Sequence, residues 1–376
     1  MITELKSVLL DDFWIMPQTP KYTESGIPYV TSKNIKNEKI NFENVNYISI
    51  EDYKKISKNR PILKNDILIS MIGTLGETAI VDDSYGEFYG QNMFLVRLDN
   101  SKIDYRYFIN FFKSTYVKNH LARKQNKSTQ SYLKANHIES LMIPVITIKE
   151  QKEIANQLDK VQDLIKLKTQ QIEKLDDLIK SQFVEMFGEP LTSNNYGRVT
   201  LDKLTKVNQG LQIPISKRFN EDGKDRYKYI TIQYLNGGKQ TEYIENPNDR
   251  VICKKDDILM TRTGNTGQVI TNVEGVFHNN FFKVDYDREK LNKEFLIKYF
   301  EDDGIYRDMI RRATTSTIPD LSHSEFYKMS IDLPPIELQN EFAELVKQIN
   351  QQKFEIEKSL KEMQELYESL MDKYFG

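Results

Sequence analysis

Residues 150–186, EQKEIANQLDKVQDLIKLKTQQIEKLDDLIKSQFVEM, decide how this chain is organised. Apolar residues recur along the stretch in steps of three and four, which is typical of a helix that offers one face to a partner helix. This seam consists of Ile154, Leu158, Val161, Ile165, Ile172, Leu175, Ile179 and Met186, with Lys168 and Gln182 at two further positions. The pattern predicts one long helix.

The same seam occurs a second time, 188 residues further along the chain. It consists of Phe342, Val346, Ile349, Lys353, Ile356, Leu360, Met363, Tyr367, Leu370 and Tyr374. The first run ends in Phe187-Gly188 and the second in Phe375-Gly376, and the length of 376 residues is twice 188. One unit that ends in a long helix has therefore been duplicated in tandem.

The residues ahead of each helix repeat more loosely and are typical of strand-rich domains. KNDILISMIGTLGE (64–77) aligns without a gap with KDDILMTRTGNTGQ (255–268), and short β-prone runs alternate with turn residues in the first copy. A helix is predicted over Tyr105–Arg123. We therefore expect an α+β fold with a domain at 1–148, a helix at 149–188, a second domain at 189–336 and a second helix at 337–376.

Chain connectivity favours an antiparallel pairing of the two helices. Thirty-seven helical residues span about 55 Å, whereas a compact domain of about 150 residues is roughly 40 Å across. A parallel pair would force the second domain to bridge the helix length, whereas an antiparallel pair places both connections at one end. We expect a long antiparallel two-helix coiled coil with a domain at each end and an internal pseudo-two-fold axis. The sequence also allows two alternatives, in which each apolar seam packs on its own domain or joins two chains in a dimer.

Composition excludes several kinds of site. The net charge is only −2, so any nucleic-acid surface must be a local patch. A single cysteine excludes an internal disulfide and a multi-thiolate metal site, and the four histidines lack ligand spacing, so we expect no metal and no cofactor. The chain shows no signal peptide and no membrane-spanning apolar run, which predicts a cytoplasmic protein without membrane contact.

Motifs of catalytic sites are absent from the sequence. The loops GTLGE (73–77) and GNTGQ (264–268) lack the lysine and the spacing of a phosphate-binding loop, and no dinucleotide fingerprint follows a strand. No Ser/His/Asp or Cys/His constellation has supporting context. We therefore expect no catalytic residues in this chain.

Basic and hydroxyl side chains gather at equivalent places in both copies and suit contacts to phosphates. A solvated loop after a helix is the plainer explanation, but recurrence in both copies favours binding. We predict DNA contacts from Arg123, Lys124, Lys127, Ser128, Thr129 and Gln130 in the first copy, and from Arg311, Arg312, Thr315, Ser316 and Thr317 in the second.

The two glycine loops carry different side chains on one scaffold. Arg262 and Asn265 stand where the first copy has Met71 and Thr74. Arginine with guanine and asparagine with adenine are favoured pairings in the major groove, so Thr74, Arg262 and Asn265 are further candidates for DNA contact. The glycines also suit simple hairpin turns, and the sequence leaves both roles open.

These features together resemble the specificity subunits of type I restriction–modification enzymes, over essentially the whole chain. The second helix start departs slightly, with Leu338 where the first has Glu150. The resemblance is carried by the twofold repeat, the strand-plus-glycine block, the segments STQSYL (128–133) and STIPDL (316–321), the proline-then-glutamine start of each helix (Pro144 to Gln151, Pro334 to Gln339) and the Phe-Gly helix ends.

The resemblance implies a non-catalytic DNA-binding subunit. Its two target recognition domains would read the halves of a bipartite site in double-stranded DNA, and its helices would set the gap and dock two methyltransferase (modification) subunits. Catalysis would belong to those subunits and to separate restriction (endonuclease and translocase) subunits. Two alternatives stay open: a coiled-coil interaction or scaffold protein with two protein-binding domains, and a stand-alone DNA-modifying enzyme.

Overall fold

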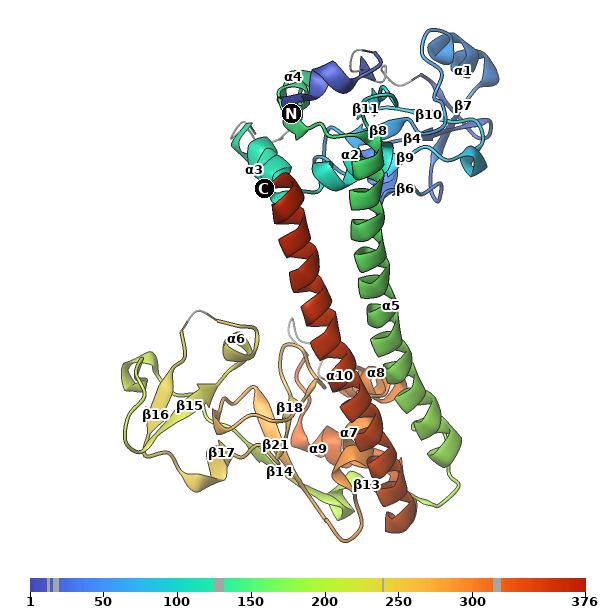
Figure 1. Cartoon of the computed structure of the whole chain (residues 1–376). Coiled ribbons are helices and arrows are strands. Elements are labelled where there is room, and N and C mark those ends of the chain that lie inside the picture. Colours follow the sequence, from blue (N-terminus) through green and yellow to red (C-terminus); the bar gives the residue numbers. More distant parts are fainter. Residues whose placement is uncertain (12–13, 16–19, 125–131, 239, 314–318) are drawn as a thin grey trace. The chain divides into compact units, whose positions relative to one another are not determined.

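The structure is a computed structural model that describes residues 1–11, 14–15, 20–124, 132–238, 240–313 and 319–376 (Figure 1). It divides into two compact units: unit 1 is Met1–Thr169 with Lys358–Gly376, and unit 2 is Gln170–Glu357. Helices α5 (Ile148–Phe187) and α10 (Ile336–Phe375) confirm the two long helices predicted from the seams, and each supplies one part to each unit.

Unit 1 contains, besides its parts of α5 and α10, short strands and four short α-helices among its described residues. The strands are β1 (Ile2–Glu4), β2 (Trp14–Ile15), β3 (Tyr22–Thr23), β4 (Ile27–Val30), β5 (Ile35–Lys36), β6 (Lys39–Ile40), β7 (Asn46–Ile48), β8 (Ile67–Ser70), β9 (Thr78–Ile80), β10 (Tyr89–Gly90), β11 (Met93–Val96) and β12 (Met142–Pro144). The helices are α1 (Ile50–Ser57), α2 (Tyr105–Phe112), α3 (Thr115–Lys124) and α4 (Ala135–Glu139).

Unit 2 repeats this plan with its own variations. Its strands are β13 (Arg198–Thr200), β14 (Thr205–Gln209), β15 (Arg226–Ile230), β16 (Tyr243–Glu245), β17 (Ile252–Cys253), β18 (Ile258–Thr261), β19 (Val269–Ile270), β20 (Gly275–Phe277), β21 (Phe281–Tyr286) and β22 (Ser330–Asp332). Its short helices are α6 (Ile232–Leu235), α7 (Lys293–Glu301), α8 (Asp303–Arg312) and α9 (His323–Tyr327).

The sheets of the two units correspond. One four-stranded sheet has the order β2-β11-β8-β9 in unit 1 and β14-β21-β18-β19 in unit 2. A second contains β7-β4-β10 in unit 1 and β16-β15-β20 in unit 2, and in both the first pair is antiparallel and the second parallel. The duplication seen in the sequence is therefore a duplication of folded structure.

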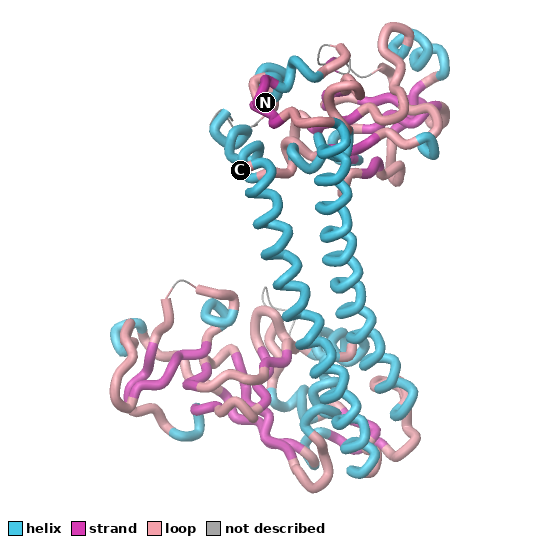
Figure 2. The backbone as a smooth tube through the Cα atoms, viewed as in Figure 1, coloured by secondary structure: helices cyan, strands magenta, loops and turns pink. Residues whose placement is uncertain are grey.

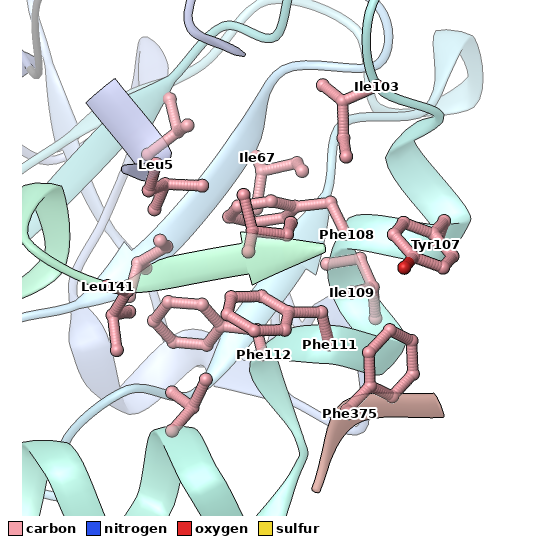
Figure 3. Packing of buried hydrophobic residues seen from close by; sticks show 14 of the residues in the cluster. Leu5, Ile67, Ile103, Tyr107, Phe108, Ile109, Phe111, Phe112, Leu141 and Phe375 are labelled. Atoms are coloured by element: carbon pink, nitrogen blue, oxygen red, sulfur yellow. The ribbon is translucent and has the colours of Figure 1, made fainter. Parts of the chain in front are cut away.

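The main core of unit 1 joins its sheet to both long helices. Leu158 of α5 and Phe375 of α10 are buried in the same cluster as helix α2. Figure 3 shows Phe375 against Tyr107 and Phe111, with ring centroids 5.0 and 5.8 Å apart. The end of the second repeat's helix thus completes the core of the first unit.

The two helix parts in unit 1 run antiparallel, side by side (Figure 2). The Tyr374 hydroxyl donates to Gln157 Oε1 at 3.0 Å, and Gln162 Nε2 donates to the Tyr367 hydroxyl at 2.9 Å. Residue numbers therefore rise along one helix as they fall along the other.

Unit 2 contains the matching arrangement. Phe183 and Phe187 of α5 pack on Phe342 of α10, each at a centroid distance of 5.4 Å. Lys353, which occupies a seam position, bonds Asp176 across the helices at 2.5 Å. A neighbouring carboxylate thus neutralises the charge of this lysine within the seam.

A buried glutamine fixes the start of each long helix. The Gln151 amide, wholly buried, accepts from Asp104 N at 2.8 Å and donates to Lys102 O at 2.9 Å and to Ile146 O at 2.8 Å. It therefore ties α5 to the backbone that precedes α2. Gln339 makes the same three bonds in unit 2, to Asn292 N, Lys290 O and Pro334 O.

The single helix predicted over Tyr105–Arg123 is wrong, because the structure has α2 and α3 there. Lys113 ends α2, and the Ser114 hydroxyl accepts from Val117 N to start α3. Asp302 stands at the equivalent place in unit 2 and caps α8 through Gly304 N and Ile305 N. A short capping side chain restarts the helix in a new direction, although the apolar pattern continues across the break.

Candidate nucleic-acid interface

The two glycine loops are the connections of β-hairpins, β8–β9 and β18–β19. In the first loop the Ser70 hydroxyl accepts from Glu77 N at 2.9 Å and donates to Thr74 O at 2.5 Å. Thr261 makes the same two contacts in the second loop, to Gln268 N and Asn265 O. Both glycines of each loop have φ between +78° and +91°, which explains why glycine occupies these positions.

The second glycine of each loop lies against the helix that carries the predicted basic residues. A Cβ on Gly76 would meet Leu121 of α3 at 3.2 Å, and one on Gly267 would meet Met309 of α8 at 3.3 Å. The hairpin loop and the basic helix are therefore neighbours in each unit. Residues that were predicted from separate stretches of sequence share one region of the fold.

Two of the loop candidates are exposed and a third is not. Thr74 and Asn265 occupy equivalent exposed positions at the loop tips. The Arg262 side chain is only 17% exposed, since its Nε and Nη2 bond the Asp320 carboxylate at 2.9 and 2.7 Å. Arg262 is thus a half-buried, fixed guanidinium at the base of its loop.

Apart from Arg262, the basic candidates that the structure describes lie in the last turns of α3 and α8. Arg123 and Lys124 are exposed and form no ion pair with any residue that the structure describes. Arg311 and Arg312 both contact the buried Asp308, and the Arg311 side chain is still 76% exposed. Arg123, Lys124 and Arg311 are therefore accessible to a polyanion.

The remaining candidates lie outside the described residues. These are Lys127, Ser128, Thr129 and Gln130 in the first copy and Thr315, Ser316 and Thr317 in the second.

Sequence reasoning missed Asp320, the partner of Arg262. A signal was present, because the two copies differ at both positions together: Met71 and Tyr132 stand in unit 1 where Arg262 and Asp320 stand in unit 2. The structure confirms this equivalence, since Leu133 N donates to Met71 O and Leu321 N donates to Arg262 O.

The Arg262–Asp320 ion pair changes the pKa of its own carboxyl and of a nearby histidine. The Arg262 guanidinium holds the pKa of the Asp320 carboxyl below its usual value. Burial, and then the same guanidinium, lower the pKa of the nearby His323 imidazole. At neutral pH the cluster therefore consists of an ion pair beside an uncharged histidine.

Neither a metal site nor a membrane span is found in the described part of the chain. It holds no group of three or more His, Cys, Asp or Glu side chains able to bind an ion. No helix in these residues is both long and apolar enough to cross a bilayer.

The chain is similar to proteins of one class. It matches the family described as "Type I restriction modification DNA specificity domain" twice, over residues 15–177 and 194–366. The "Putative type I restriction enzyme MjaX specificity subunit" of Methanocaldococcus jannaschii is 24% identical over 379 aligned positions, which cover 91% of this chain and 86% of that protein.

Two solved structures share the fold at 17% identity, and both align with all of this chain. One is described as "Structural basis underlying complex assembly and conformational transition of the type I R-M system", with a TM-score of 0.62 and 97% of that chain covered. The other is a type I restriction–modification S subunit from M. genitalium, with a TM-score of 0.58 and 96% covered. With two matches of the family that together span most of its length, the chain belongs to the type I restriction–modification DNA specificity family.

Proposed function

We propose that this chain is the specificity subunit of a type I restriction–modification complex and that it recognises a bipartite site in double-stranded DNA. The observation that carries the proposal is the duplicated hairpin loop. Both units hold it with the same hydroxyl bonds, yet place different side chains on it, Thr74 in one and Asn265 in the other. A shared scaffold with different exposed residues suits two readers of two different half-sites.

Each copy of the repeat recognises one half of the DNA site. The domain at 1–148 reads one half-site and the domain at 189–336 reads the other. Arg123, Lys124 and Arg311, together with the basic and hydroxyl residues that follow them, contact phosphates and so set register. The antiparallel helices, 149–188 and 337–376, hold the two domains at a fixed separation.

Catalysis belongs to partner proteins, namely two methyltransferase (modification) subunits and the restriction subunits, which meet this chain on DNA in the cytoplasm. Exposed apolar side chains on the long helices support a docking role. Leu164 and Leu167 on α5 are 43% and 54% exposed, and Phe354 on α10 is 64% exposed. A partner helix would bury such side chains.

Co-expression with the methyltransferase subunit of the native host tests the proposal. The assembly is expected to methylate a two-part sequence with a fixed gap, and the isolated chain is expected to show no methyltransferase, nuclease or ATPase activity. Methyl transfer by the purified chain alone, or an assembly that binds all DNA sequences equally, would show the proposal to be wrong.

A further inference from the structure

Arg262 and Asp320 form a planar, bidentate pair at the base of the unit 2 loop. The carboxylate accepts from Nε and Nη2, which form one edge of the guanidinium. The adjacent edge, made by Nη1 and the second hydrogen of Nη2, is left over. Among the residues that the structure describes, none accepts a hydrogen bond from Nη1.

The backbone around this arginine is fixed on three sides. Arg262 N donates to Asn280 O at 2.7 Å, and Arg262 O accepts from Leu321 N at 2.9 Å. The wholly buried Thr266 hydroxyl also contacts Arg262 O, at 3.0 Å. Both the main chain and the guanidinium are therefore held before any ligand arrives, which reduces the conformational entropy lost on binding.

A second arginine in the protein shows what a purely structural pair of this kind looks like. Arg97 binds Asp66 through the same Nε and Nη2 atoms, at 2.8 and 2.7 Å, and is also 17% exposed. Its outer edge is used, because Nη2 also donates to Pro61 O and Nη1 lies 3.7 Å from Asp11. Asp66 is buried, whereas Asp320 is 35% exposed. Only the outer edge of Arg262 is left for a ligand in this comparison.

Unit 1 lacks both members of the pair. Met71 and Tyr132 occupy the two positions, so the first loop has neither the cation nor its carboxylate partner. The pair therefore does not belong to the shared scaffold of the repeat. It varies between the copies, as a residue that reads one half-site and not the other must vary.

We propose that Arg262 reads a guanine in the second half-site and that Asp320 positions it to do so. The free edge offers two parallel N–H donors, which match the O6 and N7 acceptors of guanine in the major groove. Asp320 keeps the guanidinium plane in one orientation and so excludes the bases that offer a donor at either place. This inference rests on the proposed function and identifies the base that its second domain reads.

The experiment compares variants of the full chain in complex with its methyltransferase subunit. Arg262→Met installs the residue of the other copy, Arg262→Lys keeps the charge but not the planar edge, and Asp320→Asn removes the positioning charge. Methylation of a randomised DNA library measures base preference at every position of both half-sites, and thermal unfolding measures stability.

Both Arg262 variants are expected to lose discrimination for guanine by about 5- to 150-fold at one position of the second half-site. The first half-site should not change. Asp320→Asn should weaken preference at that same position, and it should add nothing in the Arg262→Met background. Arg97→Met, the matched control, should lower the thermal midpoint and leave both half-sites as they were.

Two outcomes overturn the inference while the proposed function stands. One is an unchanged recognition sequence in the Arg262 and Asp320 variants of an assembled complex. The other is a uniform loss of binding to all sequences, which would make Arg262 a phosphate contact. A wild-type complex without a bipartite site would instead remove the proposed function, and the inference with it.

Discussion

At the residue scale, buried polar side chains bind backbone groups, both within single hairpin loops and between segments about 47 residues apart. The hydroxyls of Ser70 and Thr261 close the two hairpin loops, and the amides of Gln151 and Gln339 fasten the long helices. Each satisfies backbone groups that no regular secondary structure pairs. Such groups are costly when left unpaired, so these side chains matter more than their size suggests.

Replacing Gln151 by leucine should destabilise unit 1 by about 2–4 kcal/mol, because the Asp104 N–H and the carbonyls of Lys102 and Ile146 lose their buried partner at almost constant side-chain volume. Gln339→Leu should do the same to unit 2. Thermal and urea unfolding measure the loss. The control is Gln171→Leu, at an exposed position of the same helix, which should change little. Equal unfolding midpoints for Gln151→Leu and Gln171→Leu would contradict this role of the Gln151 hydrogen bonds.

All four histidines should make the protein less stable as the pH falls from about 7 to about 5. Burial is the largest cause that lowers the pKa of His120, His137, His278 and His323, and nearby cations add to it. The unfolded chain, with histidine pKa values near 6.5, therefore binds protons that the folded chain does not. The free energy of unfolding rises with pH across this window and levels off above it.

Thermal midpoints measured at pH 5.5 and 7.5 check the sign. His120→Gln should reduce the difference between the two midpoints, since one of the four contributions is removed. A midpoint that rises on acidification would mean that the histidines gain rather than lose proton affinity on folding.

At the element scale, α3 and α8 carry basic last turns beside the glycine loops. Removing two charges from one of them should weaken binding without changing what is read. Arg123→Ala with Lys124→Ala should lower affinity for all DNA sequences alike and reduce the slope of log affinity against log salt by up to about 2. Lys54→Ala with Lys55→Ala, an exposed pair on α1, is the control. A change in the methylated sequence would show that the α3 pair contacts bases.

The long helices act as a spacer in the proposed complex, so their length should set the gap. Insertion of four residues after Thr169 in α5 and four after Glu357 in α10 lengthens both helices at the unit boundaries by about 6 Å. The preferred gap should grow by about two base pairs, which methylation mapping would reveal. Insertion in α5 alone, which breaks the pairing register, should abolish recognition. An unchanged gap after the double insertion would remove the spacer role.

The elements also show where sequence reasoning succeeds and fails. The long helices are predictable because their seam repeats regularly over ten turns. The sequence leaves two roles open for the loop glycines, and the structure shows the hairpin turns. The break at Ser114 was missed because one hydroxyl cap decides it while the apolar pattern runs on. The Arg262–Asp320 pair was missed because its members are 58 residues apart, and only the fold brings them together.

At the scale of the whole molecule, the core of unit 1 is completed by residues from the second repeat. Met371 and Phe375 fill it, and their equivalents in the first repeat are Phe183 and Phe187, which fill unit 2. Phe183 and Phe187 are large and apolar, as Met371 and Phe375 are. The first repeat therefore carries side chains that can complete the core of unit 1 in a second copy of the same repeat.

A fragment of residues 1–188 should therefore pair with a second copy, each donating Phe183 and Phe187 to the other. Burial of the exposed seam at about 25 cal/mol per Å² favours this association. The dimer would have a true two-fold axis and should recognise an inverted repeat of the first half-site. The mass of the fragment, and methylation mapping with the methyltransferase subunit, test this. A monomer, or methylation that retains the second half-site, would contradict it.

The division of unit 1 between two distant stretches also orders the events of biosynthesis. Unit 2 is one continuous stretch, Gln170–Glu357, and can close as it leaves the ribosome. Unit 1 has to wait for residues 358–376, roughly 10–40 seconds at usual rates of translation. During that interval the apolar seam of the first repeat's helix is exposed to solvent, and the same seam is exposed on neighbouring nascent chains. On a polysome that translates this mRNA, first repeats from different chains can therefore pair with each other. Chaperones or slow initiation of translation would have to prevent this pairing.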